Sequence, residues 1–409
     1  MNILLINHYA GSQTYGMEYR AYYLAKEWVN QGHKVTIVAA TFSHLRLRNP
    51  IVEKDYQVEM IDGIKYIWLS TPTYEGSLKR ILNMSIFVRK LNKYAKKLSR
   101  EEQPNLVIAG SCYPLDNYAA HKIAKMSGAK YTYEVRDIWP LSPKLIGGYS
   151  DHHPFIWVMQ RAEDYAYKHV DKVVSLLWNA EGHMRERGLA PNKFVCVPNG
   201  YYPEEWTEDK FSLPLPEEHQ KAFDGLNGKA IVGFAGGFAA SGALKTLLGA
   251  AEELKNQNEI HFVLVGKGPE EQQLKEFVDS REMNNVTFLP SVSKQMIPAL
   301  VHQFDIAYYG GIHSELHKYG TAANKMTDYM LSSKPIIQSL DEPGSLVEKI
   351  GAGIRVPAED STKVTKAVLD LVKMGPEKMN EMGEKGRKYA IEKLSWSKLA
   401  FDFLSVFIK

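Results

Sequence analysis

The chain has 409 residues, 44% of them hydrophobic and 24% charged, which is typical of a soluble globular enzyme and predicts two domains of about 200 residues. Its two cysteines, Cys112 and Cys196, exclude a disulfide framework and a cysteine-based metal site, and they favour a reducing compartment. The first residues, MNILLINHYAG, lack a positively charged leader, so we expect a β-strand there, no signal peptide and a cytoplasmic location.

Charge is distributed unevenly, although the net charge is only +3. Residues 1–200 contain 26 Lys and Arg against 18 Asp and Glu, whereas residues 201–409 contain 24 against 29. This asymmetry predicts that the first half meets an anionic partner, either nucleic acid or a phospholipid surface. Because zinc-finger spacing, RNP patterns and basic heptads are absent from the sequence, we expect no nucleic-acid partner.

The first predicted elements form a βαβ unit. Residues 3–7 and 35–40 are expected to be buried parallel strands, and residues 17–31 an amphipathic helix between them. Gly16 precedes this helix, where a glycine allows close approach to a ligand, and the Met17 end of the helix can face a phosphate. The loop lacks the G-x-G-x-x-G spacing, so it carries no dinucleotide fingerprint.

A basic amphipathic helix is predicted from Leu78 to Arg100. This segment contains eight Lys and Arg residues and no acidic residue. Such a helix can lie on an anionic membrane, with each cation near the surface contributing about 1 kcal/mol. The alternative is the solvated outer face of a helix whose other side packs on the core.

A charged motif, EVRDIWP, ends the predicted strand 131–135. Ligands of open α/β sheets bind beyond the carboxyl ends of strands, so Glu134, Arg136 and Asp137 are candidate site residues, as is Ser111 in the loop after predicted strand 106–109. Alternatively, an Arg136–Asp137 or Arg136–Glu134 ion pair only braces this loop.

A second α/β series follows residues 201–228, which are rich in Pro, Glu and aromatic residues and are expected to be a linker. Glycine turns follow predicted strands at Gly236-Gly237, at Gly266-Lys267-Gly268 and at Gly320. In a parallel sheet these turns share one edge and face one ligand, which predicts a nucleotide site.

The segment YGTAANKMTDYMLSSKP, residues 319–335, predicts a loop that opens a helix. Thr321 is the expected N-cap, and the first turn would offer free N–H groups to a phosphate. Lys325 adds a cation, Asn324 lies beside it, and Asp328 lies one turn further along, where a carboxylate can accept both hydroxyls of a ribose. An ordinary amphipathic helix with a solvated Lys and Asp is the alternative.

These motifs resemble those of the retaining glycosyltransferases of family 4, which have the GT-B fold. The resemblance rests on Gly16 and its helix, on GHKV (32–35), VPNG (197–200), Gly236-Gly237, VGKGP (265–269) and residues 328–335. The EVRDIWP motif and Asn324-Lys325 are most similar to the fucosamine and N-acetylhexosamine transferases of O-antigen and capsule synthesis.

The chain departs from the family pattern at five positions. The first of the family's two glutamates aligns with Gly320, and the second aligns with Asp328. The Arg and Lys that neutralise the diphosphate align with Gly237 and Gly242, and we infer that Lys325 replaces part of that charge. The family's acceptor-side His aligns with Arg136, which leaves Arg136 and Asp137 as candidates for its role.

The resemblance implies two Rossmann-like α/β domains that face each other across a cleft. Residues 1–200 would bind the acceptor, residues 201–390 the nucleotide-sugar, and a helix in residues 391–409 would pack back toward the first domain. It also implies retention of configuration, no metal ion and no other cofactor, a donor that is UDP-linked, a lipid-linked or polysaccharide acceptor, and peripheral attachment to the inner membrane face through Leu78–Arg100.

The implied site residues fall into three groups. The catalytic candidates are Asp137, Arg136 and Lys325; the donor-binding candidates are Gly16, Gly236, Gly237, Gly266, Gly268, Thr321, Asn324 and Asp328; the acceptor-side candidates are Glu134 and Ser111. Two alternatives remain open: a UDP-N-acetylhexosamine 2-epimerase of the same architecture, and a non-catalytic nucleotide-sugar-binding protein.

Overall fold

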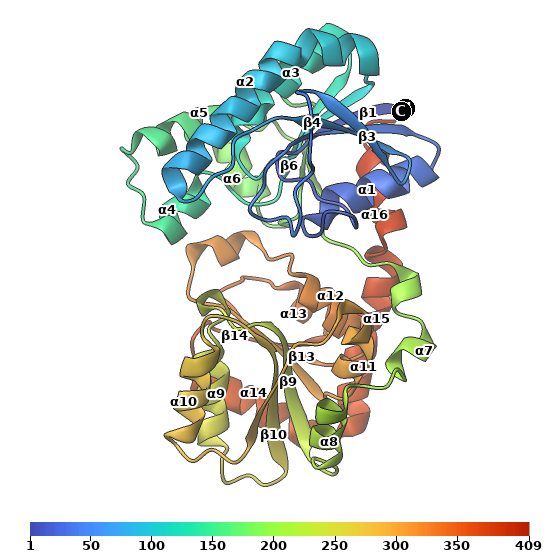
Figure 1. The fold of residues 1–409 in the computed structure, drawn as a ribbon. Helices are drawn as coiled ribbons and strands as arrows, with labels where there is room; N and C mark the ends of the chain where they lie inside the picture. The colour runs from blue at the N-terminus through green and yellow to red at the C-terminus, as the bar shows by residue number, and fades with distance from the viewer. Residues whose placement is uncertain (409) are drawn as a thin grey trace. The chain divides into compact units, whose positions relative to one another are not determined.

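Two parallel β-sheets, each flanked by helices, organise the chain in the computed structural model, which describes residues 1–408 (Figure 1). The chain divides into two units. The first is Met1–Asn199 together with the residues from Trp396 onward, and the second is Gly200–Ser395. The predicted α/β class with two doubly wound domains is confirmed; that the domains face each other across a cleft stays a prediction.

The sheet of the first unit has the strand order β3-β4-β2-β1-β5-β6-β7-β8. All neighbours pair in parallel except the edge strand β3, which is antiparallel to β4. The strands are β1 (Asn2–Ile6), β2 (Lys34–Ala40), β3 (Gln57–Ile61), β4 (Ile64–Leu69), β5 (Leu106–Ala109), β6 (Lys130–Val135), β7 (Lys172–Ser175) and β8 (Phe194–Cys196). The order reverses between β1 and β5, which is where ligands bind in doubly wound sheets.

Helices connect these strands, as right-handed parallel crossovers require. They are α1 (Tyr19–Asn30), α2 (Ser77–Glu102), the short 3₁₀ helix η1 (Pro114–Asp116), α3 (Asn117–Ser127), α4 (Leu141–Gly147), α5 (Pro154–His169) and α6 (Glu181–Glu186). Helix α1 begins at Tyr19 and not at Met17 as predicted, because Met17 and Glu18 adopt left-handed backbone angles, with φ of 54° and 50°.

The first unit is completed by a helix from the far end of the sequence, α16 (Trp396–Ser405). The buried indole of Trp28 in α1 donates a hydrogen bond to the Ala400 carbonyl at 3.0 Å. Its ring meets Phe403 edge-on, with centroids 5.1 Å apart. These contacts bury the apolar face of α16 on α1, so the chain rejoins the first unit at Trp396.

The second sheet is parallel throughout, with the strand order β11-β10-β9-β12-β13-β14. Its strands are β9 (Ala230–Gly237), β10 (Ile260–Lys267), β11 (Val286–Leu289), β12 (Ile306–Gly310), β13 (Ile336–Ser339) and β14 (Gly353–Val356). The order reverses between β9 and β12. Gly236 and Gly237 form the end of β9 and not the predicted turn, and they lie at the switch point of this sheet.

The helices of this unit lie on both sides of the sheet (Figure 1). They are η3 (Ala240–Gly242), α9 (Leu244–Glu253), α10 (Glu271–Asp279), η4 (Lys294–Met296), α11 (Ile297–His302), η5 (Glu315–Tyr319), α12 (Asn324–Leu331), α13 (Leu346–Ile350), α14 (Ser361–Met374) and α15 (Pro376–Lys393).

The segment expected to be a linker is part of the second unit instead. It forms η2 (Pro203–Glu205), α7 (Glu208–Phe211) and α8 (Glu217–Asp224). Its aromatic residues Trp206, Phe211 and Phe223 are buried in the core of that unit, which explains why a stretch without periodicity is ordered. Within residues 1–408, none of the helices combines the length and the apolar character that crossing a membrane requires.

Candidate functional site

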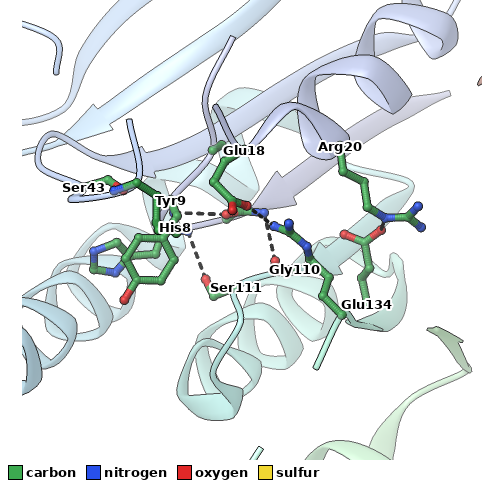
Figure 2. A network of polar contacts seen from close by, with 12 residues as sticks. His8, Tyr9, Glu18, Arg20, Ser43, Gly110, Ser111 and Glu134 are labelled. Atoms are coloured by element: carbon green, nitrogen blue, oxygen red, sulfur yellow. Dashed lines mark hydrogen bonds and ion pairs between the residues drawn. The ribbon is translucent and has the colours of Figure 1, made fainter. Parts of the chain in front are cut away.

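The switch point of the first sheet is filled by a network of polar side chains (Figure 2). The Ser111 hydroxyl, after β5, accepts a hydrogen bond from the His8 backbone N–H at 3.0 Å, and His8 Nδ1 lies 2.6 Å from the Tyr113 hydroxyl. Ser111 is 1% exposed. The Ser111 hydroxyl thus joins the loops after β1 and β5 inside the protein, and its acceptor-side role stays a prediction.

Glu134, the other predicted acceptor-side residue, is also internal. Its carboxylate pairs with the guanidinium of Arg20 in α1 at 2.9 Å, and both side chains are buried. Arg20 also donates hydrogen bonds to the carbonyls of Pro198 and Val197, at 2.6 and 2.8 Å. Burial lowers the pKa of Arg20 and the Glu134 carboxylate opposes that shift. The pair ties α1 to β6 and to the segment after β8.

Arg136 pairs with Glu18 at 2.5 Å. The alternative prediction, an ion pair of Arg136 with Asp137 or with Glu134, was therefore wrong. Burial lowers the pKa of the Arg136 guanidinium, but Glu18 and Glu134 outweigh it and raise the pKa above its ordinary value. The Asp137 side chain is exposed, and its carboxylate has neither a hydrogen bond nor an ion pair with the residues that the structure describes. Asp137 is thus free to meet a ligand, while Arg136 is held.

Gly16 lies in a left-handed turn with φ of 72°, and its N–H donates to the Ser12 carbonyl at 2.8 Å. A Cβ at this position would lie 2.7 Å from the Leu47 side chain, so chain geometry and packing already require glycine. The predicted phosphate contact at the start of α1 is not supported, because Glu18 places a carboxylate there.

In the second unit, the glycines at the carboxyl ends of β9 and β10 allow two backbones to meet. A Cβ on Gly266 would lie 1.8 Å from the Gly236 carbonyl oxygen, and one on Gly268 would lie 2.3 Å from the Phe238 oxygen. Gly237 is open, since the atom nearest to such a Cβ is 4.0 Å away. The paired strand ends border a cavity of about 320 Å³, whose lining includes Gly236, Gly237, Gly266, Lys267 and Ser291.

Lys325 reaches the same edge. Its Nζ lies 2.7 Å from the position that a Cβ on Gly236 would take, and 4.4 Å from the centre of the Phe234 ring. Burial lowers the pKa of Lys325, and Asp328 opposes that shift. Lys325 forms no ion pair within the described part of the chain. The ammonium is thus held at the switch point without a carboxylate counterion.

Helix α12 begins at Asn324, and its N-cap is Ala323 without a side-chain hydrogen bond. The predicted N-cap role of Thr321 is therefore wrong, because the Thr321 hydroxyl instead donates to Glu342 at 2.9 Å. Asn324 is exposed at the start of the helix.

Asp328 lies one turn into α12, on the side of Lys325. Burial raises the pKa of Asp328 to about 7, with Glu205 adding to the shift and Lys294 and Lys325 opposing it. Within residues 1–408 the Asp328 carboxylate accepts no hydrogen bond. Helix α12 therefore carries a carboxyl group, Asp328, and an amino group, Lys325, and both can contact a ligand.

Glu342 was missed by the sequence reasoning. It is fully buried, and one carboxylate oxygen accepts hydrogen bonds from Thr321 and from the Gln338 side chain, at 2.9 and 2.7 Å. Its other oxygen has no partner, and burial raises its pKa to about 7. Glu342 follows β13 closely in the sequence. Because the carboxyl ends of parallel strands share one edge of the sheet, its position after a predicted strand marked it as a candidate site residue.

The arrangement in the second unit suits a ligand that carries both an anionic group and a ring with hydroxyl groups. A cation without a counterion, open backbone at Gly237 and a free carboxylate lie at one end of one sheet. Searching residues 1–408 for three His, Cys, Asp or Glu side chains close enough to hold a metal ion finds no such group.

Comparisons with known proteins agree with this geometry. Residues 15–200 match the family described as "Glycosyl transferase 4-like domain", and residues 229–374 match "Glycosyl transferases group 1". WcaI of Escherichia coli (strain K12), a protein assigned to colanic acid biosynthesis as a glycosyl transferase, is 23% identical over 323 residues, which cover 75% of this chain and 74% of WcaI.

Two solved structures share the fold over almost the whole chain. Sucrose-phosphate synthase from Thermosynechococcus elongatus has a TM-score of 0.70 at 15% identity, covering 99% of this chain and 98% of that one. HepE from Anabaena, solved in complex with UDP and glucose, has a TM-score of 0.66 at 15% identity, covering 100% and 99%.

Proposed function

This chain belongs to the glycosyltransferases of family 4, which have the GT-B fold, and from that premise we propose that it transfers a sugar from a UDP-linked donor to a lipid-linked or polysaccharide acceptor in cell-surface glycan synthesis. The UDP complexes of HepE and the assignment of WcaI to colanic acid biosynthesis support this choice of donor and process. The family resemblance further implies retention of configuration without a metal ion.

The observation that carries the proposal is the Lys325 ammonium, which lies against Gly236 at the switch point and has no carboxylate partner among residues 1–408. Breaking a sugar–phosphate bond develops negative charge on the leaving diphosphate. A preorganised cation and the free N–H groups at the start of α12 stabilise that charge more in the transition state than in the ground state. Lys325 would therefore be a catalytic residue, and Gly237 would let the diphosphate approach the backbone.

Asp328 would hold the ribose of the donor. A carboxylate with free lone pairs can accept both hydroxyls of a ribose diol, and one turn of α12 separates Asp328 from the start of the helix. Asn324 would line the helix start, while Thr321 would act through its hydrogen bond to Glu342.

On the acceptor side, Asp137 would orient the attacking hydroxyl, because its carboxylate is exposed and unpaired within the described chain. Arg136 would be a positioning residue, since Glu18 neutralises its charge. With attack on the face that the diphosphate leaves, a phosphate oxygen of the donor would take the acceptor proton.

Attachment to an anionic membrane would involve α2. The exposed basic side chains of this helix include Lys79, Arg89, Lys93, Lys96 and Arg100. Leu78 and Leu82, at its start, are exposed as well, at 84% and 55%. Cations beside exposed leucines suit a phospholipid surface.

The test is to incubate the purified full-length chain with UDP-sugars, first alone and then with a membrane lipid extract that contains lipid-linked acceptors. We expect UDP release that requires the extract, and a product whose anomeric configuration, measured by NMR, matches the donor. Inversion of the configuration at C2 of the UDP-sugar without an acceptor would establish the epimerase instead. Tight binding of UDP-sugars with no release under any acceptor would establish the non-catalytic binding protein.

A further inference from the structure

The first unit contains a second hollow, a cavity of about 690 Å³ between the start of α2, α4 and the loop after β6. Figure 1 shows α4 beside the N-terminal end of α2. The cavity's walls are mainly apolar and include Ile81, Met84, Trp139, Ile146 and Phe155. None of the roles proposed above uses this space.

Arg80 lines this wall together with His44, whose pKa is lowered by burial and by the charge of Arg80. Arg80 is half-buried, its Nε lies 3.4 Å from the Tyr9 hydroxyl, and its guanidinium carbon lies 5.7 Å from the centre of the Tyr9 ring. No acidic side chain of residues 1–408 pairs with Arg80. The acid lining the same cavity, Glu75, is exposed to solvent. A half-buried guanidinium without a counterion favours an anionic ligand.

The rim of the cavity is apolar and open to the surface. Ile146 of α4 is 71% exposed and Leu145 beside it is 45% exposed. Exposed apolar side chains gathered around a hollow mark a binding site for an apolar ligand or surface. One end of the cavity therefore offers a cation, and its walls and rim offer apolar contact.

The cavity adjoins the proposed acceptor residue, because Trp139 in its wall follows Asp137 by two residues in the same loop. Trp139 is braced by Phe155, with ring centroids 6.1 Å apart. A ligand in the cavity would thus lie beside the carboxylate that is proposed to meet the acceptor hydroxyl.

We propose that this cavity binds the lipid part of the acceptor, an apolar chain that ends in a phosphate, with the phosphate on Arg80 and the chain along Trp139, Met84 and Ile146. This inference rests on the proposed function, since it specifies the acceptor as a membrane lipid phosphate rather than a soluble glycan. A chain leaving the cavity past the exposed Ile146 would continue into a bilayer.

The test measures binding by calorimetry with the full-length chain and three probes: farnesyl phosphate, farnesol and inorganic phosphate. We expect farnesyl phosphate to bind more tightly than the other two. Arg80→Gln should weaken farnesyl phosphate binding about tenfold or more, because it removes a charge-assisted contact, and should leave farnesol unchanged. Ile146→Asp, at an exposed position that does not threaten folding, should weaken both. Lys122→Gln, at an exposed lysine of α3, is the matched charge control.

Equal binding of inorganic phosphate and farnesyl phosphate would overturn the proposal in favour of a soluble anion. An unchanged affinity of the Arg80→Gln variant for farnesyl phosphate would also overturn the proposal, because the phosphate would then not lie on Arg80. A UDP-glucose titration separates this inference from the proposed function: donor binding without farnesyl phosphate binding removes the lipid site and leaves the transferase standing. Farnesyl phosphate binding without binding of any UDP-sugar would remove the acceptor role.

Discussion

The two switch points of this protein treat charge in opposite ways. In the first unit, Arg20 is paired with Glu134 and Arg136 is paired with Glu18. In the second unit, the charged groups of Lys325 and Asp328 form no ion pair within residues 1–408. Both sheets reverse their strand order at a switch point, but the charges at that point are paired in the first unit and unpaired in the second.

The difference in charge pairing indicates where a ligand binds. A buried charge is costly unless a partner neutralises it, so an unpaired half-buried charge indicates that a ligand supplies the partner. At the first switch point the protein supplies its own partners, and the side chains left open there are Asp137 and, in the neighbouring cavity, Arg80. The comparison predicts that removing one member of a buried ion pair lowers stability, whereas removing an unpaired charge such as Lys325 weakens the handling of a ligand.

The largest effect on stability is expected for Glu134→Gln. It leaves the buried Arg20 guanidinium without its counterion and should lower the free energy of unfolding by about 3–5 kcal/mol. Urea denaturation monitored by circular dichroism would measure it. Lys130→Gln is the matched control, because the Lys130–Asp171 pair is exposed and is worth less than about 1 kcal/mol. Equal losses in the two variants would contradict the stabilising role of the buried pair.

Lys325→Met should act on catalysis. We expect kcat to fall about 100- to 1,000-fold, as when an electrostatic donor to the leaving group is removed, while the melting temperature changes little. Steady-state UDP release and a thermal melt would check both parts. Lys366→Met, at an exposed lysine of α14, controls for loss of charge. Loss of folding with Lys325→Met would return this residue to a structural role.

Glu342→Gln should change how the stability of the protein depends on pH. Because burial raises the pKa of Glu342 from 4.5 to about 7, the unfolded state ionises first as pH rises, and the native state loses stability between these values. Glutamine lacks this loss, so the stability of the variant relative to the natural chain should rise by roughly 3 kcal/mol from pH 4.5 to 7. Urea midpoints across this pH range measure the change. A stability difference that stays constant with pH would refute the assignment.

Asp328→Asn is expected to have the smallest of these effects. Losing a charged acceptor to the ribose should weaken UDP-sugar binding about 10- to 100-fold, with a smaller change in kcat. Calorimetry with UDP-glucose and with UDP measures the loss. Asp370→Asn, at an exposed aspartate of α14, serves as the control. Unchanged affinity would place the ribose elsewhere.

Much of the fold could be predicted because local patterns determine it. Apolar runs such as residues 3–7 and 35–40 correspond to β1 and β2, and the basic segment 78–100 lies within α2. The stretch 201–228 was misjudged, since its order comes from aromatic residues packing on distant elements rather than from periodicity.

The positions of site residues at strand ends could be predicted from the sequence. The hydrogen-bond and ion-pair partners of individual side chains could not. Gly236, Gly266 and Lys325 meet at one edge, as the sheet argument required. The pairing of Arg136 with Glu18 joins positions 118 residues apart, so adjacency in sequence suggested the wrong partners. Thr321 likewise binds Glu342 instead of capping its own helix.

The return of α16 to α1 makes the first unit discontinuous in sequence. A recombinant half that stopped at Asn199 would lack the Ala400 carbonyl that accepts from Trp28, and the indole would lie bare beside the space left by Phe403. To express the first unit alone, residues 396–408 would have to be spliced onto its end through a short flexible tether. Exchanging halves between related enzymes would, for the same reason, need two crossover points instead of one.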